Sequence, residues 1–492
     1  MKPSRLATAV VAALTLLLAA LLSPSSALAQ GPALEVAPSG GDDTAAIQQV
    51  IDRAAAQRTG VRLRPGARYT TTAELELKLG LTSFDGRGAT IVAKLPDLGK
   101  PGNVFRFSTH SKGIKLTEVG IDLSGSVKET RGVLAAAVED VEISKLRITG
   151  SRYRAIDVVA NHGPVRRVHV HTNTVTGPQG TKSTEGSQAI SVTSHTAVED
   201  RFTGMPAAVY DRFRETGTVA APKHEATQVR IEDNRIDGGY YGISLSGATG
   251  CQIFGNTSTN NVRNLSMQDR SSNNHVRNND FNDSESSAVH LAYGSSNNIV
   301  EHNRITTSRA HGQGLLQAYQ GSTGNTFRHN RVVASGQARP SWFMYVATGS
   351  HNTVFQGNTL IGKAGSAVAA AESIWDRRSA VSRGFNPNPH SYSGNRTTHP
   401  GTGKPVDFAG GSGDLRGVAF IGNTLATQGQ PFYLGAEVTL GPEDTKPAVG
   451  NLIGVRISGN QLKGSGYTSP IVEHRGSLPK VGTASISYAE KQ

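Results

Sequence analysis

Residues 300–332 read VEHNRITTSRAHGQGLLQAYQGSTGNTFRHNRV, and the six letters at the start, VEHNRI, return in altered form at the end as FRHNRV. Each copy holds an apolar residue, two polar residues, an asparagine, one more polar residue and a final apolar residue. The two asparagines, Asn303 and Asn330, are 27 residues apart. A motif that returns at this interval predicts a structural unit that is repeated along the chain.

The motif occurs in eight copies between residues 231 and 462. Its aligned asparagines are Asn234, Asn256, Asn279, Asn303, Asn330, Asn358, Asn423 and Asn460. The first six of them lie 22 to 28 residues apart, which is the length of one coil of a solenoid. The chain is therefore expected to stack one coil on the next.

The coils are predicted to be built from strands. Apolar and polar residues alternate in short runs such as GISLS and AVHLA, and Gly, Asn and Ser separate these runs. A leucine-rich horseshoe has a similar period, but its leucine consensus is missing, so an all-β parallel β-helix is favoured. The asparagine tolerates the backbone angles of a turn, and its amide can bond to the same residue one coil up and down. We therefore expect an internal asparagine ladder.

Residues 1–29 begin with two cations, Lys2 and Arg5, continue with a long apolar run and end in the letters ALA. This pattern predicts a secretory signal peptide, with an uncleaved anchor as the alternative. Residues 30–492 would then form a single domain in the periplasm or outside the cell. We expect no stable membrane insertion and a monomer.

Removal of Lys2 and Arg5 changes the formal net charge from +12 to +10. A basic exported chain favours polyanionic partners, and an acidic polysaccharide is expected in preference to nucleic acid, whose binding motifs are absent. The single cysteine, Cys251, lies in an alternating strand, where a buried thiol is expected.

Residues 41–77, GDDTAAIQQVIDRAAAQRTGVRLRPGARYTTTAELEL, resemble the opening of the pectate-lyase-like right-handed parallel β-helix superfamily. In that family the Asp-Asp-Thr letters precede a helix that caps the first coil. Here a capping helix is expected over about 43–57, with Thr44 as its N-cap and an apolar stripe at Ile47, Val50 and Ile51. The resemblance continues to about residue 465. Because this fold carries lyases, hydrolases, epimerases and inert fibres, the function has to be inferred from the site.

The strand about 14 residues before each ladder asparagine places one residue inward and the next outward. The expected inward column is Ile243, Leu265, Val289, Leu316 and Met344, and the expected outward column is Ser244, Ser266, His290, Gln317 and Tyr345. His290 is thus predicted on the outer face. The turns that enter these strands carry further cations, imidazoles and aromatic rings.

These residues suit β-elimination on a uronate, which needs a cation for the carboxylate, a base for the C5 proton and an acid for the leaving oxygen. Arg309 or Arg339 is the candidate cation, His290 or His311 the base and Tyr345 the acid. The candidate substrate-binding residues are Tyr240, Tyr241, Arg263, Gln317, Trp342 and Asp157. Inserted loops over about 194–226 and 376–410 are expected to border this face.

Other readings stay open. A glycoside hydrolase would use two carboxyl groups, for which Asp157 and Glu185 are the candidates. A uronan epimerase or a non-catalytic glycan-binding protein would also fit this fold. No cofactor or metal is predicted: His169 and His171 share one strand face without an identifiable third ligand. Ca²⁺ remains an alternative, because carboxylates from different coils can converge without a sequence spacing.

Overall fold

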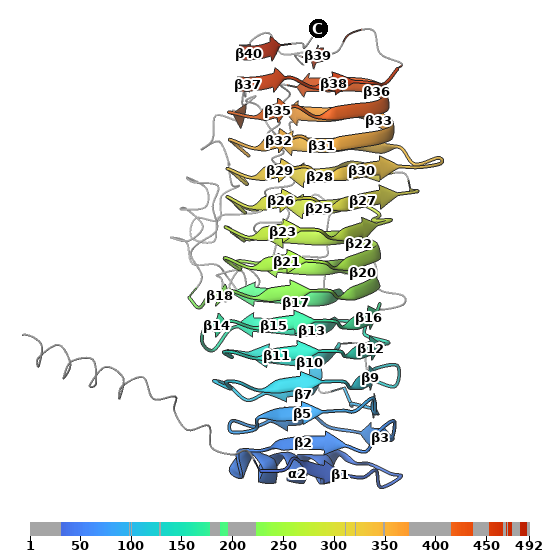
Figure 1. The fold of residues 1–492 in the computed structure, drawn as a ribbon, viewed down its shortest axis with the longest axis vertical. Helices are drawn as coiled ribbons and strands as arrows, with labels where there is room; N and C mark the ends of the chain where they lie inside the picture. Colours follow the sequence, from blue (N-terminus) through green and yellow to red (C-terminus); the bar gives the residue numbers. More distant parts are fainter. Residues whose placement is uncertain are drawn as a thin grey trace, which may run out of the picture.

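The computed structural model describes residues 31–97, 99, 101–126, 129–177, 187–194, 223–309, 311–319, 321–347, 350–372, 415–435, 452–465, 469, 471–474 and 483–489, with only the backbone for 311, 312, 471–474 and 483–489. These residues form strands that stack along one axis into a parallel β-helix (Figure 1). The helix α2 (Thr44–Ala56) covers one end of the stack, and the last strands lie at the other end.

One face of the stack, sheet A, contains sixteen strands, and every pairing in it is parallel. Its members are β1 (Leu34–Val36), β2 (Gly60–Leu63), β5 (Ser83–Asp85), β8 (Lys115–Thr117), β11 (Glu142–Ser144), β15 (His169–His171), β19 (Arg230–Glu232), β21 (Gln252–Phe254), β23 (His275–Arg277), β26 (Ile299–Glu301), β29 (Thr326–Arg328), β32 (Val354–Gln356), β34 (Leu415–Arg416), β35 (Ala419–Ile421), β37 (Leu452–Ser458) and β40 (Thr483–Ala489).

A second sheet has 22 strands, also parallel, and bends into two faces. The two faces belong to one sheet because four long strands run from one face into the other. The first face, B1, contains β3 (Arg68–Thr71), β6 (Thr90–Ala93), β9 (Gly120–Asp122), β12 (Arg147–Thr149), β16 (Thr174–Thr176), β24 (Asp280–Asn282), β27 (Arg304–Thr307), β30 (Arg331–Ala334) and β38 (Gln461–Leu462). From β16 onward, each of these strands directly follows a ladder asparagine. The long strands β20 (Arg235–Ser246), β22 (Thr257–Gln268), β33 (Thr359–Glu372) and β36 (Thr424–Gly435) belong to both faces.

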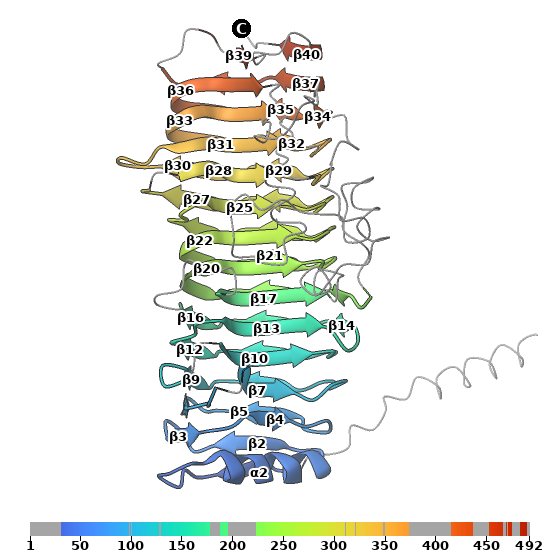
Figure 2. The same ribbon diagram turned by 180° about the vertical axis from the view of Figure 1, so that it is seen from behind.

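The other face, B2, contains the C-terminal halves of those long strands and β4 (Leu75–Leu77), β7 (Gly102–Phe107), β10 (Thr130–Ala136), β13 (Arg154–Ala160), β17 (Gln188–Ser194), β25 (Ser287–Leu291), β28 (His311–Ala318), β31 (Pro340–Ala347) and β39 (Ile471–His474). Figure 2 shows most of these strands one above another. A separate pair, β14 (Val165–Arg166) and β18 (Ala226–Thr227), lies beside the stack (Figure 1).

The core fills the interior of the stack with side chains from all three faces. On B2 the predicted inward column is confirmed, because Ile243, Leu265, Val289, Leu316 and Met344 pair in succession and all are fully buried. On sheet A the rings of Phe327, Phe355 and Phe420 stack, with centroids 4.8 and 5.3 Å apart. Alternation along each strand therefore places the apolar residues inside.

The asparagine ladder is confirmed from end to end. The Asn303 amide donates to Oδ1 of Asn330 at 3.0 Å, and Oδ1 of Asn303 accepts from the Asn279 amide at 2.9 Å. The ladder runs through all eight predicted residues and begins one coil earlier, at Asn173. A second ladder, which the sequence analysis missed, joins Asn274, Asn298 and Asn325 at the turn that leads into sheet A.

The unusual backbone angles are not on the ladder asparagines themselves. The residue immediately before each of them has a positive φ, as His302 (53°), His329 (53°) and Gly357 (62°) illustrate. The asparagine side chain satisfies backbone groups inside the turn, while the left-handed residue before it makes the chain change direction. The expectation that the asparagine adopts the strained conformation was therefore wrong by one position.

The capping helix is present, and Ile47, Val50 and Ile51 are buried under it as predicted. Thr44, however, is the first helical residue and not the N-cap, which is Asp43. The thiol of Cys251 is fully buried, and burial raises its pKa to about 12. This thiol is accordingly an inert core group.

Some predicted segments lie outside the described residues: the signal peptide (1–29), the loop 376–410 and residues 195–222 of the loop 194–226. No helix in the described part of the chain is long and apolar enough to span a membrane.

Candidate functional site

The outer surface of B2 carries a central column of polar side chains. In register from coil to coil it contains Asp157, Ser191, Ser244, Ser266, His290, Gln317 and Tyr345. The predicted outward column is therefore confirmed, and it extends two coils further toward the N-terminus. Neighbouring members lie about 4.8 Å apart along the axis.

His290 points outward but is not exposed to solvent. Its exposed fraction is 0%, and Ser266, one coil before, is equally buried. The imidazole Nδ1 lies 3.3 Å from Oγ of Ser266, and the ring is 5.7 Å from that of Tyr319. The position on the outer face is as predicted, but His290 belongs to an enclosed polar cluster and not to an open surface.

The cluster continues from Ser266 to an arginine. Gln268 donates from Nε2 to Oγ of Ser266 at 3.0 Å and to the phenol oxygen of Tyr241 at 3.1 Å. That phenol oxygen also accepts a hydrogen bond from Arg263 at 3.3 Å. Five side chains from three successive strands, β20, β22 and β25, thus form one connected network, which we call the Arg263–His290 cluster.

Arg263 is the one member of this network with a permanent charge. Its exposed fraction is 2%, its charge lies 5.8 Å from the centre of the Tyr241 ring, and its Nε has no hydrogen-bond partner among the described residues. No carboxylate of the described residues forms an ion pair with it. A buried cation without an anion is costly, and functional sites are places where such a cost persists.

The cations that the sequence analysis favoured lie elsewhere. Arg309 is held at the bend between B1 and B2, where it bonds to Glu285 at 3.1 Å and to Asn260 at 2.9 Å. Arg339 is exposed. The contacts of these two arginines thus do not join them to His290. The backbone of His311 lies in β28 opposite Pro340, and its side chain is outside the described part of the structure.

Aromatic and amide side chains flank the cluster. The rings of Tyr240 and Tyr241 meet edge to face at 4.7 Å. Gln317, next in the column after His290, accepts a hydrogen bond from Ser287 at 3.0 Å. Trp342 and Tyr345 stack on each other further along the face, with centroids 4.4 Å apart.

Asp157 has a clear structural role. It is fully buried, and its carboxylate bonds to Arg131 at 2.7 Å and to Arg154 at 3.1 Å. Both guanidinium groups also lie near the ring of Tyr153, at 4.9 and 5.4 Å. A carboxylate whose oxygens are taken up by two guanidinium groups serves to hold neighbouring coils together. Glu185, its suggested partner in hydrolysis, is not among the described residues.

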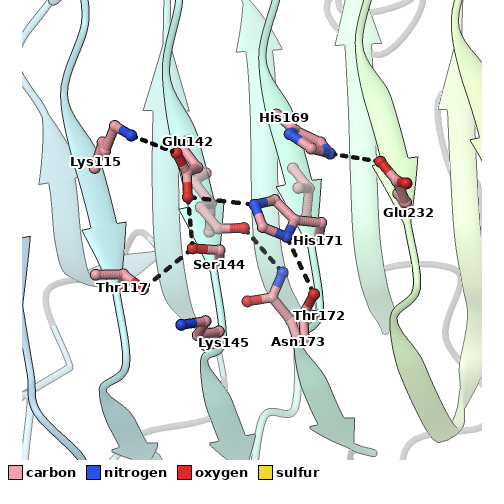
Figure 3. Close-up of polar contacts among 12 residues, drawn as sticks. Lys115, Thr117, Glu142, Ser144, Lys145, His169, His171, Thr172, Asn173 and Glu232 are labelled. Atoms are coloured by element: carbon pink, nitrogen blue, oxygen red, sulfur yellow. Dashed lines mark hydrogen bonds and ion pairs between the residues drawn. The ribbon is translucent and has the colours of Figure 1, made fainter.

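Sheet A carries a second polar cluster, shown in Figure 3. His169 and His171 stack at 4.1 Å; His169 lies 2.9 Å from Glu232, and His171 lies 3.3 Å from Glu142. Burial lowers the pKa of His169, and the hydrogen bond to Glu232 opposes this shift. Glu142 also pairs with Lys115, at 3.2 Å. In the described part of the chain, no three His, Cys, Asp or Glu side chains are placed to hold a metal ion.

Two members of the Arg263–His290 cluster received no role from the sequence. Ser266 was predicted to lie in the outward column, but no function was assigned to it, and Gln268 was not predicted to be part of the site. The signal was available for both, because residues two apart on a strand share a face. The contact between Tyr241 and Arg263 also had a signal, because each lies two residues before a member of the inward column, and the pairing of β20 with β22 sets them side by side.

Comparisons with known proteins agree with the architecture. Residues 223–374 match the family model described as "Right handed beta helix region". Compared with curated proteins, the sequence has no significant match. The described coils and this match define a right-handed parallel β-helix protein.

Among solved structures, the chain is similar to PfbA, a surface adhesin of Streptococcus pneumoniae, with 14% identity, 85% of this chain and 94% of that chain covered, and a TM-score of 0.54. It is more loosely similar to the A-module of the mannuronan C-5 epimerase AlgE4 of Azotobacter vinelandii, with 14% identity, coverage of 91% and 96%, and a TM-score of 0.44. At such identities the likeness concerns the fold alone.

Proposed function

We propose that this protein binds an acidic, uronate-containing polysaccharide on the B2 face and cleaves it by β-elimination. The observation that carries the proposal is Arg263, a buried guanidinium that no carboxylate of the described residues neutralises. An anionic ligand that supplied this missing charge would gain a charge-assisted hydrogen bond in a site shielded from water.

A sugar carboxylate suits the surroundings of Arg263. The neighbouring groups are hydroxyls and an amide, from Tyr241, Ser266 and Gln268, and these can exchange hydrogen bonds with sugar hydroxyls. A guanidinium binds a carboxylate through two parallel hydrogen bonds. The positive net charge of the chain would also attract a polyanion. Because Arg263 and His290 are buried, the side chains that cover them have to move when the ligand enters.

The cluster holds the three groups that β-elimination requires. Arg263 would neutralise the carboxylate and so make the C5 proton more acidic. His290 would take that proton on its imidazole while the C4–C5 double bond forms and the bond from C4 to the glycosidic oxygen breaks. Tyr241 would donate a proton to the departing oxygen. We prefer Tyr241 to Tyr345 for this last role because it belongs to the same hydrogen-bonded network.

Two alternatives lead to different products. Hydrolysis would need a second carboxyl group beside Asp157, and Asp157 is committed to Arg131 and Arg154. A non-catalytic glycan-binding protein would need Arg263 but not His290. Proton return to C5 without bond cleavage would make the protein an epimerase.

The test is incubation of the purified protein with a panel of acidic and neutral polysaccharides. Unsaturated product is followed by ultraviolet absorbance, and binding by calorimetry. We expect an acidic glycan to bind, and Arg263→Gln to weaken its binding by about 10- to 100-fold, the value of a hydrogen bond to a charged group.

The matched control is Arg277→Gln, because Arg277 lies on sheet A, where its charge rests 4.6 Å from the Phe254 ring. It should leave binding unchanged. Equal binding by wild type and Arg263→Gln would refute the anion site. Binding with no unsaturated or hydrolysed product would leave the non-catalytic alternative.

A further inference from the structure

Trp342 and Tyr345 form a stacked aromatic pair on β31 that remains partly exposed. Their ring planes are inclined by 23°. By contrast, Arg263, His290 and Gln317 on the same face are no more than 3% exposed. The aromatic pair is thus more open to a ligand than these three residues.

The register of B2 aligns this pair with Arg263. Arg263 pairs with Ser287, and Gly314 pairs with Trp342. Ser287 and Gly314 are successive members of one column, because Val289 and Leu316, two residues further on, are paired. Trp342 therefore lies three coils from Arg263, a distance of roughly 14 Å along the axis.

The two residues between the ends of this column are small. A Cβ added at Gly314 would lie 2.6 Å from the Cβ of Tyr345, so the glycine is what allows the tyrosine to take its place. Ser287 donates to Gln317, and Ser286 donates to Gln313 at 2.8 Å. Hydroxyl and amide groups thus line the surface between Arg263 and the aromatic pair. No bulky side chain stands between Arg263 and Trp342 in their column, where only Ser287 and Gly314 intervene.

Trp342 also has an unused donor. Its Nε1 is buried and has no hydrogen-bond partner among the described residues. An indole N–H in such a position usually finds a partner, and a ligand hydroxyl would provide one.

We infer that Trp342 and Tyr345 form a sugar-stacking subsite, and that the site recognises at least three consecutive sugars along the axis of the β-helix. One sugar places its carboxylate at Arg263, and another lays the apolar C–H face of its ring against the aromatic pair. This inference rests on the proposed function, since it takes the ligand to be a uronate chain. A span of three coils exceeds one pyranose ring, so a monosaccharide cannot reach both ends.

The chain itself supplies the probe for a test. It has two tryptophans, Trp342 and Trp375, and the second lies outside the described residues. In a Trp375→Phe protein the emission comes from Trp342 alone. We would titrate this protein with uronate oligosaccharides of one to six units and with neutral oligosaccharides of the same lengths.

We expect the emission to change with oligouronates of three or more units and not with the monouronate. Trp342→Ala should weaken oligosaccharide binding by about 10-fold, as loss of a stacked aromatic contact would, and leave monouronate binding unchanged. Arg263→Gln should weaken the binding of both.

The other outcomes distinguish the sugar-stacking subsite from the proposed acidic substrate. Oligouronate binding that depends on Arg263, with no emission change and no effect of Trp342→Ala, would overturn the subsite and leave the proposed function standing. An emission change that is equal for acidic and neutral chains and indifferent to Arg263→Gln would support the subsite and overturn the acidic substrate. Absence of binding to every oligosaccharide would overturn both.

Discussion

Arg263 donates a hydrogen bond to the phenol oxygen of Tyr241 across one coil of the β-helix, and this phenol is the only polar side chain of the described residues to which it is bonded. The pairing of β20 with β22 sets the two residues directly side by side. The phenol is neutral, so it solvates the guanidinium in part and does not cancel its charge. Burial of this charge thus lowers the folding stability of the ligand-free protein and leaves the guanidinium available to bind an anion.

Replacing Arg263 should therefore separate stability from binding. We expect Arg263→Met to raise the free energy of unfolding by about 1 to 3 kcal/mol, because an unneutralised charge no longer has to be buried. Chemical denaturation measures the change, with Arg277→Met as the surface control. A clear loss of stability would mean that Arg263 supports the fold and would argue against a ligand site.

His290→Ala should reduce turnover by about 10²- to 10⁴-fold, the range for a positioned acid or base. Circular dichroism should show an intact β-helix. His275→Ala is the matched control, because His275 lies on sheet A, 2.6 Å from Glu301. Full activity in His290→Ala would remove this imidazole from the mechanism, and saturated products in the wild type would point to hydrolysis.

Asn303 should be costly to replace. Its amide donates to Asn330 and to the carbonyl of Val276, and its Oδ1 accepts from the backbone and side chain of Asn279. We expect Asn303→Ala to lower the free energy of unfolding by about 2 to 4 kcal/mol, because it leaves several buried groups unsatisfied.

The control for this ladder variant is Asn278→Gly. Asn278 is exposed and has a φ of 55°, which glycine adopts without strain. Denaturation should show little change for this variant. Equal stability of Asn303→Ala and wild type would show that the ladder contributes nothing measurable.

His169 should make the stability of the protein depend on pH. Burial lowers the pKa of His169 from its usual 6.5, against the hydrogen bond to Glu232, and nearby His171 and Arg230 lower it further. The unfolded chain then binds this proton more readily than the folded one. Stability is therefore complete above about pH 6.5 and is lost as the pH falls through the window below it.

Denaturation midpoints between about pH 7.5 and 5.5 measure this loss. Glu142 and Lys115 also face His169 and His171. Burial raises the pKa of the Glu142 carboxyl, but its interactions with Lys115, Ser144 and His171 together lower it by more, so the net shift is downward, away from this window. We expect His169→Gln to flatten the dependence and His275→Gln to preserve it. An unchanged slope in His169→Gln would assign the effect to other groups.

The sequence by itself determined the period, the asparagine ladder, the inward column and the outward direction of His290. Each of these depends on local rules, namely the alternation of side chains along a strand and the recurrence of one turn. Such rules act within one coil and repeat in the next, so their consequences can be predicted from the amino-acid sequence.

Only the tertiary structure decided which charges meet. Arg309 and Arg339 stand, like Arg263, where the chain enters the strands of the His290 column. The turn geometry, however, directs Arg309 to Glu285 and Asn260 and leaves Arg339 exposed. Arg263, which looked like one cation among many, is buried beside Tyr241. Long side chains on turns have many rotamers, so their partners depend on the register of neighbouring coils and on what covers them, and neither is visible in a single coil.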